Sequence, residues 1–169
     1  IGADVQPLTE AERAFAALQA RWMQDEGGYN LIQETRPQTL AYGLHDSPAG
    51  LAAWIVEKWR GWTDPAGEVE RYFSRDLLLA NITLYWLTNT ATSAAQLYWE
   101  NNNNNFNAKE QKTAEISLPV AITVFPGEIY QAPRSWAERA YPTLIYFNEV
   151  ERGGHFAAWE EPELFTEEM

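Results

Sequence analysis

Two short apolar runs in the C-terminal third constrain the fold of this chain more than any other feature. They are VAITVF at 120–125 and LIYF at 144–147, both rich in the β-branched and aromatic residues that favour strands. Between them lies a short helix-like segment, PRSWAER at 133–139, which a following proline ends. Strand, helix and strand in this order predict one βαβ unit of a parallel sheet, because a crossover helix carries the chain back to start a second strand in the same direction.

An acidic and a basic side chain follow the two runs at comparable points. A proline–glycine turn leads from the first run to Glu128, and a two-glycine turn precedes His155. Because parallel strands end at the same edge, we expect these two side chains to lie close together, where the histidine can act as a general base and the carboxylate can fix its tautomer. The simpler alternatives are a solvated strand-end carboxylate and a surface or core histidine. Beyond the histidine, Glu160, Glu161 and Glu163 are expected to form a solvated helix start.

The first hundred residues are predicted to be helical. Thr9 and Glu12 have the spacing of a capping box, in which the hydroxyl and the carboxylate satisfy free amides at a helix start. Ser47 followed by proline is a favoured start for another helix, and we expect a third helix to run from Ser74 towards Tyr98. Their aromatic stripes suit a lid over an apolar pocket, although such stripes more often belong to a plain core.

Composition excludes several classes of function. The 169 residues, 46% of them hydrophobic, suffice for the core of one ordinary domain. A net charge of −12 argues against a nucleic-acid partner, which calls for clustered lysine and arginine. The absence of cysteine excludes disulfides and thiolate metal sites. His45 and His155 stand in unrelated contexts, so we predict no metal site, and His45 is expected to be structural.

An asparagine-rich segment interrupts the chain after the helices. Residues 101–117 are predicted to form an exposed, flexible loop, to which we assign no chemistry. No apolar run approaches the roughly 20 residues of a membrane span. We therefore expect a soluble, cytoplasmic protein, an expectation that an anchor or signal outside these residues would change.

Five segments are more specific than the order of strands and helices. They are GYNLIQ at 28–33, RPQTLAYGLHDSPAGLAAWI at 36–55, LYWEN at 97–101, FPGE at 125–128 and GGHFAAWEEP at 153–162. Together they closely resemble the microsomal-type epoxide hydrolases, the branch of the α/β-hydrolase superfamily that includes the juvenile-hormone epoxide hydrolases. The resemblance implies an α/β fold: the C-terminal portion of an α/β-hydrolase with a mostly helical lid.

The same resemblance implies a domain organisation. Residues 1–100 correspond to the lid and its flanking core helices, and residues 118–169 to the C-terminal βαβ part of the core. Such enzymes open with an N-terminal half that carries a nucleophilic aspartate on a sharp elbow between small residues, typically glycines four apart. No two of the ten glycines here are four apart. We therefore expect that half to lie outside this chain, which alone would be inactive.

Roles for individual residues follow from the resemblance. His155 corresponds to the base that activates water against an ester on the missing aspartate, and Glu128 to its acid partner. Tyr29 and Tyr98 match the two lid tyrosines that polarise the epoxide oxygen, although composition alone would assign them to the core. The implied reaction converts a small apolar epoxide to a vicinal diol without metal or organic cofactor. The implied partners are the missing N-terminal part and, by analogy with related enzymes, a second copy in a homodimer.

Two other functions stay open. The first is another α/β-hydrolase, an esterase or a dehalogenase. The tyrosine pair argues against both, since an ester calls for amide donors at its oxyanion and a halide site usually recruits tryptophan or asparagine. The second is a non-catalytic binding relative that has lost its nucleophile. An aspartate on an intact elbow upstream would exclude this relative.

Overall fold

The computed structural model describes residues 8–103 and 116–169, in which it places ten helices and two strands. The helical part comprises α1 (Glu10–Glu26), α2 (Gly28–Thr35), α3 (Pro37–Asp46), α4 (Pro48–Trp62), α5 (Val69–Tyr72), α6 (Arg75–Thr88) and α7 (Ala91–Asn103). The C-terminal part comprises β1 (Val120–Val124), α8 (Arg134–Ala140), β2 (Leu144–Glu149), α9 (Ala157–Glu160) and α10 (Pro162–Glu168). The asparagine-rich segment lies mostly outside the described residues, and its first three residues end α7.

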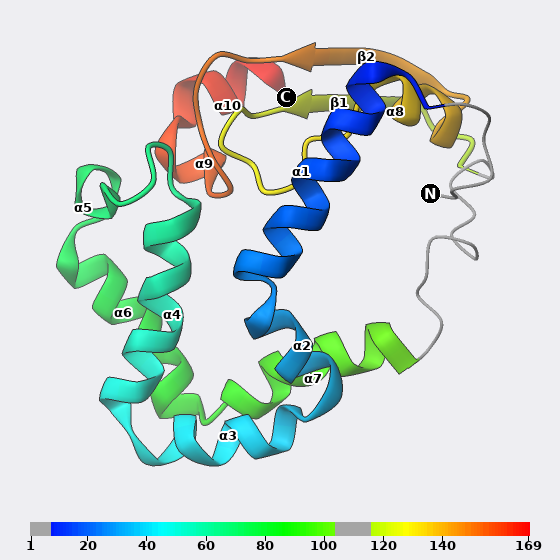
Figure 1. The fold of residues 1–169 in the computed structure, drawn as a ribbon. Helices are drawn as coiled ribbons and strands as arrows, with labels where there is room; N and C mark the ends of the chain where they lie inside the picture. Colours follow the sequence, from blue (N-terminus) through cyan, green and yellow to red (C-terminus); the bar gives the residue numbers. More distant parts are fainter. Residues whose placement is uncertain (1–7, 104–115) are drawn as a thin grey trace.

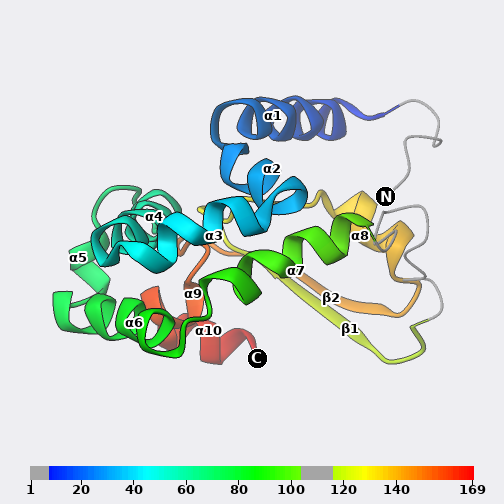
Figure 2. The same cartoon turned by 90° about the horizontal axis from the view of Figure 1, so that it is seen from below.

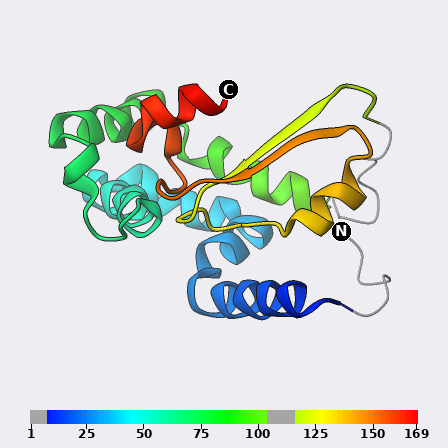
Figure 3. The same ribbon diagram turned by 90° about the horizontal axis from the view of Figure 1, so that it is seen from above.

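The strands lie at the opposite end of the molecule from most helices of the helical part. Figure 1 shows the strands side by side at one end and α3, α4 and α6 at the other, with α1 running between them. The views from below and from above (Figures 2 and 3) show α1 along one side and the strands on the other. The residues that follow β1 and β2 therefore lie near the C-terminal end of α4, although they are far from it in sequence.

The helix starts follow local chemistry. The Thr9 hydroxyl accepts from the Glu12 N–H at 3.2 Å while the Glu12 carboxylate accepts from the Thr9 N–H at 2.8 Å, so the predicted capping box is confirmed. Ser47 and Ser74 cap α4 and α6 as predicted. The single helix expected from Ser74 towards Tyr98 was wrong. It ends at Thr88, because the next residue, an asparagine with φ 56°, adopts the left-handed conformation that terminates helices.

The described core includes two apolar clusters centred on the helical part. One joins α3, α4, α6 and α7 through Leu44, Leu51, Ile82 and Ala91. The other joins α5 and α6 through Val69, Phe73 and Leu78, with partly buried Trp59, Tyr72 and Phe156 packed against it. Since Phe156 directly follows His155, the second cluster connects the helical part to residues 153–156, the histidine loop.

A parallel sheet confirms the predicted βαβ unit. β1 pairs with β2, with Ala121 opposite Tyr146 and Val124 opposite Glu149, and α8 lies between them in sequence. Parallel sheets normally have both faces covered. Here Ile145 remains 74% exposed within the described part of the chain.

Candidate active site

The strand ends bring Glu128 and His155 together. Glu128 Oε1 lies 2.7 Å from His155 Nδ1, and the two side chains are about one third exposed, at 30% and 35%. The loops that carry them are joined by a parallel bridge between Gly127 and Gly154, with the Gly127 N–H donating to the Gly153 carbonyl at 2.9 Å. The contact uses Nδ1, so the other ring nitrogen, Nε2, is left for a proton of water or substrate.

The environment of Glu128 favours its carboxylate form. Burial by itself would raise the pKa of Glu128. The hydrogen bond with His155, the charge of that imidazole when protonated, and backbone amides outweigh burial and hold the pKa below its ordinary value. One of these amides is the Ile129 N–H, 2.7 Å from Oε1. The carboxylate is therefore ready to orient the imidazole and to stabilise its protonated form.

Two predicted tyrosines meet in the helical part. Tyr29 in α2 and Tyr98 in α7 have ring centroids 6.0 Å apart, edge to face. Burial, then the neighbouring Tyr98 and Glu34, raise the pKa of Tyr29 to about 12. Burial also raises the pKa of Tyr98, against a hydrogen bond with Gln33 that lowers it. Both phenols therefore keep their protons at neutral pH and can donate hydrogen bonds.

One ring connects the two halves of the site. Trp62, the last residue of α4, has its ring 5.4 Å from that of Tyr29 and 5.0 Å from that of His155, edge to face in both cases. His155 and Tyr29 thus contact a common ring, and Tyr98 reaches it through Tyr29. Sequence reasoning did not single out Trp62, because one of eight tryptophans carries no local signal of this position.

A lysine also faces the tyrosine pair. Lys58 Nζ lies 4.4 Å from the ring centroid of Tyr29 and 5.8 Å from that of Trp62, within range of a cation–π interaction. Its side chain is only 16% exposed and pairs with Glu57 at 2.6 Å. Its spacing of four residues from Trp54 and from Trp62 puts Lys58 on the apolar stripe of this helix, but sequence reasoning gave it no role in the site.

Other predicted residues lie elsewhere or behave differently. His45 in α3 has Nε2 3.3 Å from the Thr92 N–H at the start of α7, in a part of the helical region apart from the strand ends. The expectation of a solvated Glu160 was wrong, since this residue is 4% exposed. Its carboxylate is buried because it accepts hydrogen bonds from backbone amides of the histidine loop.

Cavities adjoin both halves of the site. A cavity of about 400 Å³ is lined by Tyr98 together with apolar residues of α3, α4 and α7, and by Gln33. A smaller one of about 220 Å³ adjoins Glu128 and is walled by Leu18, Trp22 and Trp62. Both are mainly apolar in lining, which suits an uncharged, poorly solvated ligand.

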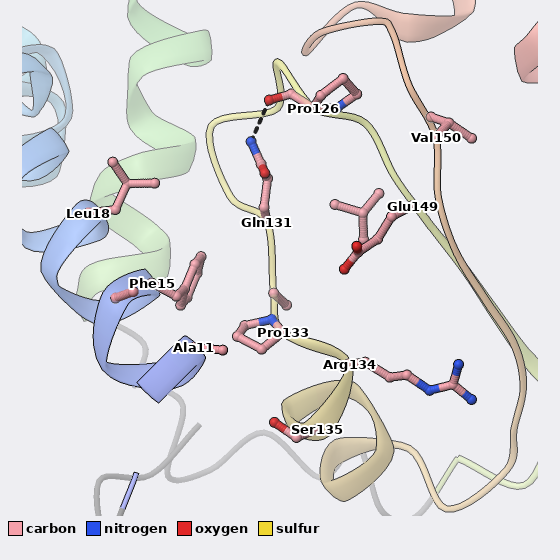
Figure 4. A pocket seen from close by; sticks show the side chains of 13 residues that line it. Ala11, Phe15, Leu18, Pro126, Gln131, Pro133, Arg134, Ser135, Glu149 and Val150 are labelled. Carbon is pink, nitrogen blue, oxygen red and sulfur yellow. Dashed lines mark hydrogen bonds between the residues drawn. The ribbon is translucent and has the colours of Figure 1, made fainter. Parts of the chain in front are cut away.

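A third cavity lies apart from the predicted site residues. It measures about 620 Å³ and lies between α1 and the segment that leads from β1 to α8. Figure 4 shows Phe15 and Leu18 of α1 on one side of the cavity and Val150, the residue after β2, on the other. The Gln131 side chain donates to the Pro126 carbonyl at 2.6 Å (Figure 4). None of Tyr29, Tyr98, Glu128 and His155 lines it.

Residues 8–103 and 116–169 contain neither a metal-binding cluster nor a membrane-spanning helix. In these ranges no three or more histidine, cysteine, aspartate or glutamate side chains are grouped so that they could hold a metal ion. No helix of the same ranges is long and apolar enough to cross a bilayer.

A carboxylate and a histidine at neighbouring ends of a parallel sheet are the arrangement of the α/β-hydrolase class. Solved structures agree with this class. The juvenile hormone epoxide hydrolase of the silkworm Bombyx mori matches 95% of this chain and 40% of its own, with a TM-score of 0.83 and 30% identity. The Aspergillus niger epoxide hydrolase matches 99% of this chain and 40% of its own, with a TM-score of 0.75 and 29% identity.

Sequence comparison narrows the class. A candidate epoxide hydrolase of Stigmatella aurantiaca is 52% identical over 160 residues, which are 95% of this chain and 35% of that protein. Epoxide hydrolase 1 of Sus scrofa is 42% identical over 150 residues, 85% of this chain and 33% of that protein. No protein-family model matches. The chain belongs to the microsomal and juvenile-hormone epoxide hydrolase family and spans about a third of the length of these curated relatives.

Proposed function

We propose that this chain forms the lid and the base-bearing part of an epoxide hydrolase, which adds water to an epoxide to give a vicinal diol. The observation that carries the proposal is the arrangement around Trp62. This ring contacts both the histidine of a histidine–carboxylate pair and Tyr29, whose phenol lies against that of Tyr98. In this division residues 1–100 supply the lid and its flanking helices, and residues 118–169 supply the last βαβ unit of the core.

The nucleophile in this proposal, an aspartate, comes from outside these residues. Two observations support an outside segment. The curated relatives extend well beyond the matched third, and β2 leaves the apolar side chain of Ile145 exposed on a sheet of a type normally covered on both faces. The lone strand pair thus has room for further strands and covering helices.

The first chemical step opens the epoxide. The aspartate oxygen attacks a ring carbon from the side opposite the ring oxygen, and the carbon–oxygen bond breaks as an ester bond forms. The departing oxygen takes a proton or a strong hydrogen bond from Tyr29 and Tyr98, whose phenols remain protonated at neutral pH. The products are a hydroxyl group and a covalent ester.

The second step releases the diol. His155 Nε2 takes a proton from water while the water oxygen attacks the ester carbonyl. Collapse of the resulting intermediate breaks the bond between the acyl carbon and the diol oxygen, which takes the proton back from the imidazolium. The acid proton left on the aspartate returns to the tyrosine that protonated the epoxide oxygen, so the carboxylate and the phenol are both restored. Glu128 at 2.7 Å from Nδ1 stabilises the imidazolium that forms. No metal or organic cofactor is required by either step.

An apolar epoxide fits the cavities best. The space beside Tyr98 is lined by Leu51, Trp54, Ile55 and Leu97 among others, and the space beside Glu128 by two tryptophans. Aryl or alkyl substituents on the epoxide would be desolvated there at little cost, unlike charged ones.

The test is hydrolysis of styrene oxide in single-turnover and steady-state assays, by the polypeptide that joins this chain to its nucleophile-bearing segment. His155→Gln should stall with substrate covalently attached, while wild type makes diol. His45→Gln is the matched control, because it changes the other histidine, which bonds Thr92 instead. Cleavage of an activated ester without epoxide turnover would favour an esterase, and turnover of neither substrate would favour a non-catalytic relative.

A further inference from the structure

The histidine loop, residues 153–156, is hydrogen-bonded along its whole length, partly to residues at the end of α4 and partly to Glu160. Each of four consecutive backbone N–H groups, those of residues 153–156, has a partner. Gly153 donates to Asp64 Oδ2 at 3.2 Å and His155 donates to the Trp62 carbonyl at 3.0 Å. The N–H groups of Gly154 and Phe156, which flank the histidine, both donate to Glu160.

Glu160 is the centre of this arrangement. Its Oε2 accepts from Gly154 at 3.1 Å and from the Asp64 N–H at 2.8 Å, and its Oε1 accepts from Phe156 at 2.9 Å. The residue is 4% exposed, so water does not replace these bonds. A carboxylate is suited to this task, since both of its oxygens accept and neither carries a hydrogen that would face the amides.

The loop lies so close to the end of α4 that position 154 has no room for a side chain. A Cβ atom at Gly154 would lie 2.6 Å from the Trp62 carbonyl oxygen and 3.0 Å from the Asp64 nitrogen. The glycine thus lets the two segments touch, and Glu160 bonds them from the third side. His155 is held between two amides whose positions depend on one carboxylate.

We propose that Glu160 is a positioning residue for His155: it bonds the amides on both sides of the histidine and the Asp64 N–H just beyond α4, and so sets the imidazole against Glu128 and the Trp62 ring. This role rests on the proposed function for its catalytic consequence. A shift of about 1 Å in a catalytic group can cost about a hundredfold in rate. The step that needs the base is hydrolysis of the ester, whereas ester formation needs the nucleophile and the tyrosines.

The variant that tests this role is Glu160→Gln, which keeps the shape but places an amide NH₂ against donor N–H groups. Glu161→Gln is the matched control. Its carboxylate is the next in sequence but accepts from the Arg152 side chain at 2.8 Å and contacts the Tyr72 hydroxyl rather than the loop amides. Both are made in the polypeptide that includes the nucleophile-bearing segment, and each half-reaction with styrene oxide is followed by rapid quench.

We expect Glu160→Gln to slow ester hydrolysis by about tenfold to a hundredfold and to change ester formation by less than about twofold. Glu161→Gln should leave both rates near wild type. An equal fall in both half-reactions, or no fall, would overturn the positioning role, since general destabilisation does not select one step. Asp64→Ala, which removes only the bond to Gly153, should show a smaller effect on the same step and serves if Glu160→Gln does not fold.

A second readout needs no turnover. Amide exchange at Gly154 and Phe156 should accelerate in Glu160→Gln, and the Nδ1 proton resonance of His155 should shift or broaden as the contact with Glu128 loosens. Unchanged exchange and an unchanged resonance would refute the positioning role. If wild type does not open epoxides, the proposed function fails, and these two signals still decide whether Glu160 positions the imidazole.

Discussion

Trp62 and His155 are joined twice: the Trp62 carbonyl accepts the His155 N–H at 3.0 Å, and the two rings lie 5.0 Å apart, edge to face. The first contact belongs to the backbone and survives any substitution of the side chain. The second belongs to the ring, which also touches Tyr29. Trp62 at the end of α4 therefore links the Glu128–His155 pair to Tyr29 and Tyr98. Loss of its ring should affect both pairs but leave the backbone hydrogen bond between His155 and Trp62 intact.

Trp62→Leu should reduce the free energy of unfolding by about 1–3 kcal/mol, because two aromatic contacts of roughly 0.5–1.5 kcal/mol each are lost. Trp62→Phe, which retains part of the ring surface, should cost less. Guanidinium unfolding of the three proteins measures the difference. A Trp62→Leu protein as stable as wild type would mean that the ring contacts contribute nothing to stability.

Removal of either tyrosine hydroxyl should slow epoxide opening. Tyr29→Phe or Tyr98→Phe takes away one donor at the developing oxyanion, for which losses of about 10² to 10³ in rate are typical. The defect should appear in ester formation, in contrast to that of His155→Gln. Tyr42→Phe is the control, since Tyr42 is 68% exposed on α3. Wild-type rates in both site variants would remove the tyrosines from the mechanism.

The pKa of Tyr29 makes a separate prediction about pH. Burial, Tyr98 and Glu34 raise this pKa to about 12, so the phenol keeps its proton well into the alkaline range. The rate of ester formation should therefore not fall between about pH 8 and 10 through loss of this proton. A decline in that interval that disappears in Tyr29→Phe would contradict the environment described for Tyr29.

Glu12 should make the stability of the fold depend on acid pH. Hydrogen bonds from the Ser135 hydroxyl, the Thr9 amide and the Arg139 guanidinium lower the pKa of Glu12 to about 2 in the folded state, from 4.5. A lowered folded-state pKa stabilises the fold above the unfolded value, so this contribution is present above about pH 4.5 and declines as pH falls towards 2.

Glu12→Gln should flatten the pH dependence of unfolding in this interval, and Ser135→Ala should flatten it partly. Glu128 and Glu168, whose pKa values are also lowered, supply a remaining slope, so only the difference between proteins is assigned to Glu12. Chemical unfolding at several pH values measures it. Parallel curves for wild type and Glu12→Gln would refute the link between α1 and α8.

Local patterns predicted the elements and the strand-end pair. The βαβ unit follows from periodicity and the parallel rule, which in turn places Glu128 near His155 without knowledge of any contact. The helix caps at Thr9, Ser47 and Ser74 could also be predicted, because each depends only on residues within one turn.

What the sequence could not predict depends on distant packing. Glu160 and Glu161 look alike in the chain, and only the approach of Asp64, 96 residues away, makes the first a buried acceptor. The meeting of Tyr29 with Tyr98 requires α2 to pack on α7, which no periodicity specifies. The turn at Asn89 depends on a single left-handed residue in an otherwise continuous helical pattern.

Gly154 should resist replacement for a reason that its own conformation does not supply. Unlike Gly153, whose φ is 104°, Gly154 does not have a positive φ, so alanine is allowed by its backbone. Yet an alanine Cβ would lie 2.6 Å from the Trp62 carbonyl oxygen and 3.0 Å from the Asp64 nitrogen, both backbone atoms that cannot rotate away.

Relief of that overlap must separate the loop from α4, and the hydrogen bond from His155 to Trp62 would lengthen with it. Gly154→Ala should therefore cost about 1–3 kcal/mol of stability, as overpacking does, and should slow the base-dependent step as well. Gly28→Ala is the matched control, because nothing lies within 4 Å of its Cβ position. Calorimetry on both variants decides the matter: equal melting temperatures would mean that the loop and α4 are not in the close contact on which the placement of His155 depends.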